Sequence, residues 1–369
     1  MKNILLTGGN GFLGSFLAID LLNNKDNKLF FLIRSKNQEE AINKLNRTLR
    51  KIVNLYNLPN DRIEIILGDI SIPNFGLDSK EKDLLCHTID QVFHCAAITD
   101  FDYPMDIISR TNVDGTKNVM EWGLECLKLG RSVKINHIST TYIAGTIKNK
   151  KIFYESDLNV SQEFNNTYEA TKFKAELVAE TYKEMGLAIK IFRTTVIIGD
   201  SVNGMALNMK SFYQILHLLS TKQFTQLPAN NSSIMNFLPV DYIVRAISKI
   251  SDTNKDTTYH IVSPDDYTFG AFVRAASTFF GFSAPDLIPL EQFDMKSLTG
   301  AQKRMIQYFV PYMNYSVSFN SEKTKKTLDE LGVKLNSINE AMLKRMFEYA
   351  IKIGFVKRDI KLIANTRFN

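Results

Sequence analysis

The feature that most constrains the fold is an alternation of short apolar runs with longer amphipathic stretches. Runs rich in Ile, Leu, Val and Phe that have no polar face are typical of strands buried on both sides, and such strands form parallel sheets covered by helices. The alternation therefore predicts an α/β fold with a doubly wound parallel sheet. We expect strands at 2–8, 28–34, 62–69, 91–97, 132–140 and 188–199, with a further strand at 257–263.

The helical pattern is strong near the start of the chain and looser after residue 200. Residues 12–24 place apolar side chains at i, i+3 and i+4, which is the spacing of one helix face, and 37–56 read as a long helix with a polar face. Residues 208–220 form another amphipathic stretch. We expect a sheet domain over 1–200, to which 236–263 return, and a smaller, mostly helical C-terminal substrate lobe made of 201–235 and 264–369.

Composition excludes several classes of protein. The chain has 369 residues, 44% hydrophobic and 23% charged, which is ordinary for a globular protein. The net charge of +6 suits an anionic ligand, but no basic run with interleaved aromatic residues indicates nucleic-acid binding. No apolar window has the length of a membrane span, and glycines end the first apolar run too early for a signal peptide. We expect a cytoplasmic protein without a membrane span.

The cysteines are few and have no metal-ligand spacing. Cys86, Cys95 and Cys126 lie in apolar segments, and an odd, small number of cysteines favours reduced thiols in a cytosolic protein. We therefore expect three free thiols and no metal site.

A glycine-rich turn joins the first strand to the first helix. The stretch LLTGGNGFLGSFLAIDLL places Gly8, Gly11 and Gly14 there. Glycines at such a turn let the backbone approach a pyrophosphate, and the helix N-terminus supplies amide donors and a favourable dipole. Because the strand, the turn and the helix occur in the expected order, the pattern predicts a Rossmann-type dinucleotide site and not an ordinary tight turn.

A tyrosine and a lysine share one face of a later predicted helix. In NTYEATKFKAE, Tyr168 and Lys172 are four positions apart, so both side chains can point toward one small molecule. A nearby positive charge lowers the pKa of a phenol, which would suit proton transfer. A surface Tyr–Lys pair gives the same spacing, so the rest of the chain has to decide between the two.

The spacing of the glycines separates these interpretations. The pattern T-G-x-x-G-x-x-G, from Thr7 to Gly14, resembles the extended short-chain dehydrogenase/reductase superfamily, in which Y-x-x-x-K is the catalytic pair. Further segments over 1–250 are similar to a narrower group within it, the thioester reductases and fatty acyl-CoA reductases of the male-sterility type. These segments are FFLIRSKNQEEAINKLNRTL, GDISIPNFGLDSKEKDLL, VFHCAAITDFDYPMDIISRTNVDGTKNV, HISTTYIAG, FRTTVIIG and FLPVDYIVRAI.

The resemblance implies roles for individual residues. Thr140, in preference to Ser139, would hydrogen-bond the reacting oxygen, Tyr168 would be the general acid, Lys172 would hold the nicotinamide ribose, and Asn112 would hold a relay water. The implied cofactor-binding residues are Thr7, Gly8, Gly11, Phe12, Leu13, Gly14, Arg34, Lys44, Asp69, Ile70, Ala96, Ala97, Tyr168, Lys172 and Thr195. The chain departs from the group at Thr194 and Thr195, where a proline and a serine are usual, in the loop that the resemblance places beside the nicotinamide.

The end of the second strand bears on the choice of cofactor. Arg34 stands where an acidic residue would bind a ribose 2′-hydroxyl, and an arginine pairs with a 2′-phosphate instead. We therefore expect NADPH. Lys44 either adds a second charge or is a solvated helix lysine, and Asp69 either borders the adenine or caps a helix.

The remaining candidates have simpler interpretations. We expect His94 and His137 to be core histidines, with His94 also bordering the cofactor cleft, and Asp241 to be a structural cap. The aromatic residues of 308–319, with Phe212, Ile215, Leu216 and Leu219, either wall an acyl channel or pack the lobe.

The expected function is a stand-alone, NADPH-dependent reductase that converts an acyl thioester of CoA or a carrier protein to an aldehyde, with further reduction to an alcohol left open. The alternative is an extended-family dehydrogenase or epimerase that acts on a sugar nucleotide or another small carbonyl compound. A non-catalytic dinucleotide sensor is less consistent with an intact Thr140, Tyr168 and Lys172. The sequence does not indicate the oligomeric state.

Overall fold

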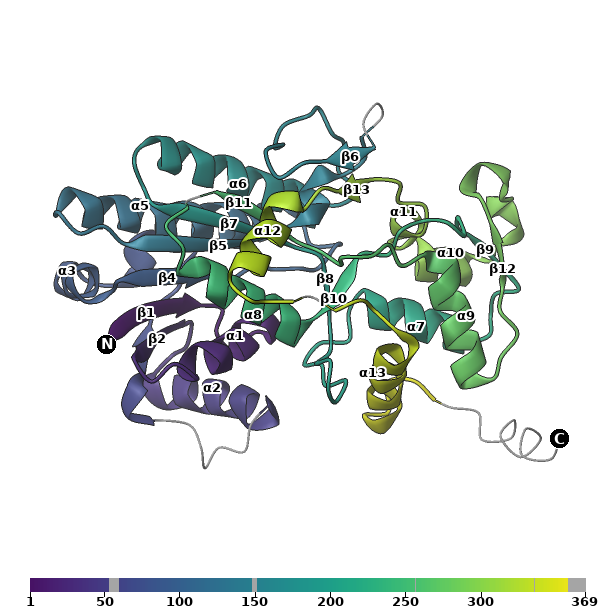
Figure 1. Cartoon of the computed structure of the whole chain (residues 1–369), viewed down its shortest axis with the longest axis horizontal. Helices are drawn as coiled ribbons and strands as arrows, with labels where there is room; N and C mark the ends of the chain where they lie inside the picture. The colour runs from purple at the N-terminus through teal and green to yellow at the C-terminus, as the bar shows by residue number, and fades with distance from the viewer. Residues whose placement is uncertain (53–59, 148–150, 256, 335, 358–369) are drawn as a thin grey trace.

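The fold is a seven-stranded parallel sheet with helices on both faces and a lobe at one end. The structure is a computed structural model, and it describes residues 1–52, 60–147, 151–255, 257–334 and 336–357. The strand order is β11-β7-β5-β4-β1-β2-β3, and every pairing is parallel. The predicted doubly wound sheet is confirmed (Figure 1). The strands are β1 (Lys2–Thr7), β2 (Asn27–Ile33), β3 (Ile63–Leu67), β4 (Gln91–His94), β5 (Lys134–Thr140), β7 (Ile189–Thr194) and β11 (Thr258–Ile261).

Both faces of the sheet are buried because its strands carry apolar residues at consecutive positions. In β1, Ile4 and Leu6 belong to the core on one face, whereas Leu5 belongs to the core on the other face. This is the two-residue alternation of a strand. The first face is covered by α1 (Phe12–Leu22), α2 (Gln38–Ile52) and α8 (Val240–Ser251), and the second by α3 (Ser79–Thr88), α5 (Gly115–Lys128) and α6 (Thr167–Glu184).

The predicted strand 188–199 is divided into two strands. β7 stays in the main sheet, whereas β8 (Val196–Ile198) leaves it and pairs with β10 (Phe237–Pro239). The division falls at Thr195, whose hydroxyl donates a hydrogen bond to the Asn236 carbonyl. The chain passes from the sheet domain into the lobe at this point.

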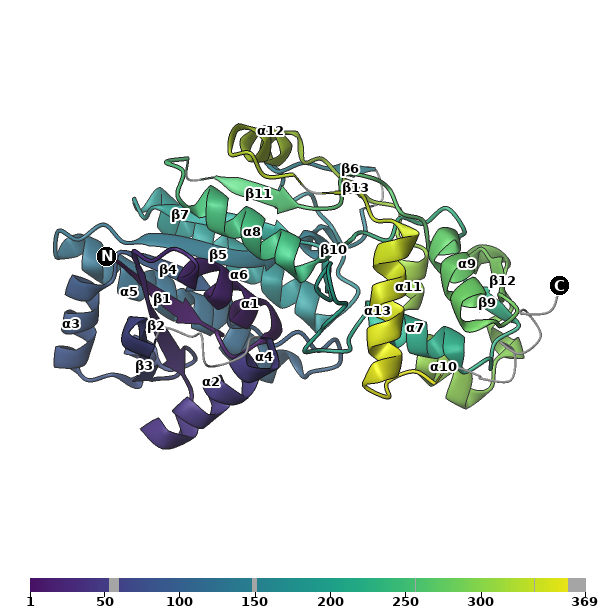
Figure 2. The same cartoon turned by 60° about the horizontal axis from the view of Figure 1, so that its bottom comes forward.

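The lobe is built around its own aromatic core. Figure 1 shows the lobe at one end of the sheet domain. Its helices and strands are α7 (Phe212–Ser220), α9 (Phe269–Phe280), α10 (Gly300–Ile306), α11 (Val310–Met313), α13 (Glu340–Lys352), β9 (Gln226–Pro228) and β12 (Asp286–Ile288). The expected lobe segment 264–369 is too broad, because α12 (Glu322–Glu330) packs on α8 and β11 of the sheet domain. Figure 2 shows α12 beside β11, away from α13.

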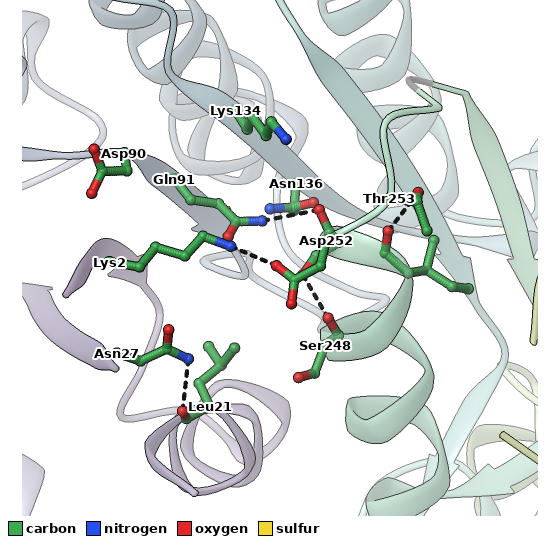
Figure 3. Close-up of polar contacts among 12 residues, drawn as sticks. Lys2, Leu21, Asn27, Asp90, Gln91, Lys134, Asn136, Ser248, Asp252 and Thr253 are labelled. Atoms are coloured by element: carbon green, nitrogen blue, oxygen red, sulfur yellow. Dashed lines mark hydrogen bonds and ion pairs between the residues drawn. The ribbon is translucent and has the colours of Figure 1, made fainter. Parts of the chain in front are cut away.

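Polar contacts join the amino ends of two strands to the end of a covering helix (Figure 3). Lys2 Nζ pairs with Asp252 at 2.5 Å, and the Gln91 amide donates to the Ser251 carbonyl at 3.4 Å. These contacts tie β1 and β4 to the end of α8. Ligands of open α/β sheets bind at the opposite, carboxyl ends of the strands, so this edge serves stability.

Two expectations about single residues need correction or refinement. Cys86 of α3 and Cys126 of α5 form a disulfide, with Cα atoms 5.2 Å apart. The expectation of three free thiols is therefore wrong for this pair, because a separation of 40 residues does not reveal which helices pack together. Cys95 is free. Asp241, expected to be a structural cap at the lobe junction, accepts hydrogen bonds from the Ser201 amide and hydroxyl, at 2.8 and 2.6 Å, and so ties a loop to the first turn of α8.

No helix among the described residues has both the length and the apolar content needed to cross a bilayer.

Candidate active site

The carboxyl ends of the central strands open into a cavity of about 370 Å³ between the sheet and the lobe. Thr140 reaches it from the end of β5, and Thr194 from the end of β7. Of the residues expected to bind cofactor or take part in catalysis, those that line the cavity are Gly8, Gly11, Phe12, Leu13, Gly14, Ala97, Thr140, Tyr168, Lys172 and Thr195. The structure thus brings the glycine turn and the Tyr–Lys pair together, although they are separated by about 150 positions in the sequence.

The glycine turn has the geometry that close backbone approach requires. Gly8 has a φ of +68°, and a Cβ there would lie 2.6 Å from the Ala96 nitrogen. A Cβ on Gly14 would lie 2.2 Å from the Gly8 carbonyl oxygen. The first turn of α1 contains no acidic residue, and no side chain caps its amides. These amides therefore remain available to an anion, so the residues present fit the pyrophosphate of a dinucleotide.

Tyr168 and Lys172 extend from the first two turns of α6. Asn166 begins this helix, because its side-chain oxygen accepts a hydrogen bond from the Glu169 amide at 3.0 Å. The Lys172 ammonium donates to the Ile138 carbonyl at 2.7 Å, which holds it beneath the end of β5. Both side chains line the cavity.

Burial dominates the acidity of this pair. It raises the pKa of Tyr168 to about 12, although a hydrogen bond with Thr140 acts in the opposite direction. Burial also lowers the pKa of Lys172 to about 8, against the charge of Glu176, which raises it. The sequence led us to expect that Lys172 lowers the tyrosine pKa; in the structure the net shift is upward, since desolvation of the phenol is the larger effect. At neutral pH, Tyr168 carries the proton that a general acid must donate.

Asn112 lies in a π-helical turn, Arg110–Asp114, behind the cavity wall. Its amide exchanges two hydrogen bonds with the Ile98 backbone, at 2.8 and 2.9 Å, and donates to the Thr171 hydroxyl at 3.1 Å. The side chain is not part of the cavity lining. Its visible role is to fix the segment after β4 against α6.

The residues expected at the adenine end lie outside the cavity lining. The Arg34 side chain is 78% exposed and its guanidinium lies 3.6 Å from the Asp69 carboxylate. Lys44 donates to the Arg34 carbonyl at 3.1 Å and pairs with Glu40 at 2.9 Å. Asp69 accepts from the Ser71 amide and hydroxyl, so it forms a local turn and does not cap the next helix, whose N-cap is Ile72.

Thr7, Ala96 and Ile70 also lie outside the lining, and Thr7 and Ala96 lie beside the glycine turn. The Thr7 hydroxyl is 2.8 Å from His94 Nδ1 and accepts from the Ala96 amide at 3.3 Å. His94 Nε2 is 3.1 Å from the Thr116 hydroxyl, so both of its ring nitrogens have partners. Burial lowers the pKa of His94 to about 3, and the ring is neutral. Ile70 packs in the core.

His137 is a core residue of a different kind. It is fully buried, and within the described residues neither ring nitrogen has a hydrogen-bond partner. Burial lowers its pKa well below the usual range, so it is also neutral.

The lobe and its connections supply an apolar wall. Of the side chains considered for an acyl channel, Phe212, Ile215, Phe309 and Tyr312 line the cavity. Leu216 and Leu219 instead pack in the lobe core, and Tyr308 is 39% exposed. Cavity residues that the sequence did not single out include Phe101, Tyr142, Lys210, Met235, Phe237 and Phe269. Phe101, Tyr142 and Phe237 lie within segments that resemble the male-sterility group, whereas no local pattern marks Lys210, Met235 and Phe269.

Comparisons with known proteins agree with this geometry. The model of a protein family described as Male sterility protein matches residues 6–247. The chain is 24% identical over 380 residues to a linear gramicidin synthase from Brevibacillus parabrevis, covering 98% of this chain and 7% of that protein. It is 28% identical over 300 residues to carboxylic acid reductase from Mycobacterium marinum, covering 73% of this chain and 25% of the enzyme. The chain thus spans only a small part of these relatives.

Among solved structures, the terminal R domain from the myxalamid PKS-NRPS biosynthetic pathway superposes with a TM-score of 0.82 and 25% identity, covering 97% of this chain and 92% of that domain. A match over residues 6–247 exceeds half of the chain. The chain therefore belongs to the male sterility protein family, and its resemblance to the thioester-reductase group of extended short-chain dehydrogenases/reductases is confirmed.

Proposed function

We propose that the protein is an NADPH-dependent reductase that converts an acyl thioester to an aldehyde. One observation carries the proposal: a single cavity joins an anion-binding glycine turn, the Thr140–Tyr168–Lys172 set and an apolar wall from the lobe. An apolar wall suits an acyl chain, whereas the hydroxyls of a sugar would need polar partners there. The carboxylic acid reductase described above is a reductase by name, which supports the same reaction class.

The chain's own residues supply binding, orientation and a proton. The amides at the start of α1 would hold the pyrophosphate, and the nicotinamide cofactor, when bound, supplies a hydride. Hydride addition to a carbonyl carbon builds negative charge on the oxygen, and aimed donors stabilise that charge. Thr140 and Tyr168 both line the cavity, and their hydroxyls are close enough for Thr140 to affect the acidity of Tyr168. One carbonyl oxygen placed between them could accept from both.

The proton and the leaving group then follow from the substrate. Tyr168 donates its proton to the oxygen, which gives a hemithioacetal. The carbon–sulfur bond of this intermediate breaks as the hydroxyl proton moves to sulfur, releasing an aldehyde and a thiol. The net reaction consumes one hydride and one proton for each thioester. Lys172 holds a positive charge beside the tyrosine and would bind the nicotinamide ribose.

The preference for NADPH rests on Arg34. Its guanidinium is exposed at the end of β2, and it is free to leave the 3.6 Å contact with Asp69 for a 2′-phosphate. Lys44 is held close by through its bond to the Arg34 carbonyl. The thiol part of the substrate would be CoA or a carrier-protein arm, which fits relatives that include a gramicidin synthase and an R domain.

The test is to follow NADPH absorbance with a panel of substrates. We expect oxidation of NADPH with acyl-CoAs or acyl-pantetheines, together with release of one thiol, read with a thiol reagent. Nucleotide sugars should give no turnover. Turnover of nucleotide sugars without thiol release would replace this proposal with the epimerase or dehydrogenase alternative, and NADPH binding without turnover of any substrate would favour a sensor.

A further inference from the structure

A tyrosine of the lobe is fastened to the first turn of the helix that carries Tyr168. The Tyr312 hydroxyl, from α11, donates to the Glu169 carboxylate at 2.6 Å and accepts from the Asn166 side-chain amide at 2.6 Å. Asn166 begins α6, and Glu169 directly follows Tyr168. The lobe hydroxyl therefore binds residues on both sides of the proposed acid.

Glu169 is an unusual residue for this place. It is fully buried, and burial raises its pKa. Ion pairs with Glu169 are absent from the described part of the chain. Its carboxylate is instead satisfied by the Asn165 backbone amide at 2.8 Å, by the Asn165 side chain at 3.1 Å and by Tyr312. A buried carboxylate without its hydrogen bonds is costly, so the folded state strongly favours the bond from Tyr312.

The Tyr312 ring also contacts Tyr168 through an intermediate ring. Phe101 stacks on Tyr312, with centroids 5.4 Å apart and planes 29° apart, and contacts Tyr168 at 6.1 Å. The Tyr142 ring contacts the Tyr312 ring edge-on, with centroids 5.2 Å apart and planes 89° apart. All four rings line the cavity. The position of the Tyr168 ring is thus coupled to the docking of the lobe both along the helix and across the aromatic stack.

The geometry points to Tyr312 and Glu169 as positioning residues for Tyr168: their hydrogen bond holds the lobe against the start of α6 and so fixes the proton donor in the substrate cavity. The consequence for turnover rests on the proposed function. Aromatic packing alone would hold the lobe without any need for the hydroxyl, and this difference makes the inference testable with single-atom changes.

The chain offers a matched control for removing the hydroxyl. Tyr315 lies in the same aromatic cluster, 6.4 Å from Tyr312 between centroids, but its buried hydroxyl has no hydrogen-bond partner among the described residues. It does not line the cavity. Tyr312→Phe removes a bond to a charged group, whereas Tyr315→Phe removes a hydroxyl that makes none.

The kinetic test compares Tyr312→Phe, Glu169→Gln, their double variant and Tyr315→Phe. We expect Tyr312→Phe to lower kcat by about tenfold, the scale of a hydrogen bond to a charged group, while the KM for the thioester and NADPH binding, read by its fluorescence, change little. Tyr315→Phe should retain wild-type kcat. Because the two residues share one bond, the double variant should lose no more than the worse single variant. Equal kcat in the two Phe variants, or effects of Tyr312→Phe and Glu169→Gln that multiply in the double variant, would overturn the inference.

A second measurement separates this inference from the proposed function. Amide hydrogen exchange over 310–315 reports local opening of the lobe without any substrate. It should be faster in Tyr312→Phe than in Tyr315→Phe and in the wild type, and equal exchange in all three would refute the hydrogen-bonded attachment. If wild-type protein reduces no thioester, the proposed function fails, and hydrogen exchange alone still decides whether the lobe is held through Tyr312.

Discussion

Glu176→Gln should destabilise the sheet domain far more than a similar change one turn along the same helix. Glu176 lies one turn after Lys172 on α6, is fully buried, and pairs with Arg193 of β7, whose side chain is 2% exposed. The arginine Nε lies 3.1 and 3.0 Å from the two carboxylate oxygens, and its Nη2 lies 2.8 Å from one of them. Its Nη1 is 3.1 Å from His260 Nε2. The Arg193 guanidinium is therefore buried together with its partners.

The expected loss of stability depends on which interactions of Arg193 remain after Glu176→Gln. Glutamine keeps the shape and one acceptor but leaves the arginine charge uncompensated. Removing one partner of a buried ion pair lowers the free energy of unfolding by ~3–5 kcal/mol. Because glutamine retains a hydrogen bond, we expect the loss for Glu176→Gln to lie near the lower value. His260 does not replace the lost charge, because burial and the neighbouring Arg193 lower its pKa to about 3 and the ring stays neutral.

Urea unfolding read by tryptophan fluorescence is a suitable assay. The single tryptophan, Trp122, is buried on α5 in the core that α6 helps to cover, so it reports on the domain that contains the ion pair. Glu180→Gln is the control, since Glu180 is partly exposed and lies 3.5 Å from Lys183 on the same helix. Glu180→Gln should lower the free energy of unfolding by at most ~1 kcal/mol. A loss below 1 kcal/mol for Glu176→Gln, or equal losses for both variants, would refute the claim that this charge is uncompensated.

Three further predictions concern catalysis and the cofactor. Tyr168→Phe should lower kcat by at least ~100-fold, because a general acid contributes that much, while NADPH binding measured by fluorescence persists; a residual kcat above a tenth of wild type would exclude Tyr168 as the acid. Arg34→Ala should raise the KM for NADPH about tenfold, the scale of a charged hydrogen bond, and leave the KM for NADH unchanged, whereas equal changes would show that Arg34 does not contact the 2′-phosphate. The pKa of Lys172 is lowered to about 8, so its charge is present below that pH and is lost above it. The value of kcat/KM should therefore decline as the pH rises from 7 to 9, and a flat profile over this range would contradict the assigned role of the lysine charge.

Local patterns were sufficient for the sheet and for the main parts of the site. The strands of the sheet were predictable because each is a short run that contains apolar residues and follows a stretch of helical pattern or begins the chain. The turn at Gly8–Gly14 and the pair Tyr168 and Lys172 were predictable because a few neighbouring residues define each motif. Their convergence in one cavity also follows from the sequence, since parallel strands place their carboxyl ends at one edge.

The pairings between distant segments were not predictable in this way. Arg193 could be recognised as part of a family motif, but its ion pair with Glu176 and its contact with His260 depend on the packing of α6 and β11 against β7. The disulfide between Cys86 and Cys126 likewise depends on how α3 lies on α5.

The sequence by itself thus determined which segments form strands and helices, which faces they bury, and which residue types meet at the carboxyl edge of the sheet. Only the tertiary structure decided that Tyr312, more than 140 residues after Tyr168, binds the first turn of the helix that carries Tyr168, and that burial raises the pKa of Tyr168. The physical reason is that periodicity records whether a side chain is buried, whereas hydrogen-bond partners and desolvation depend on which other segment covers it.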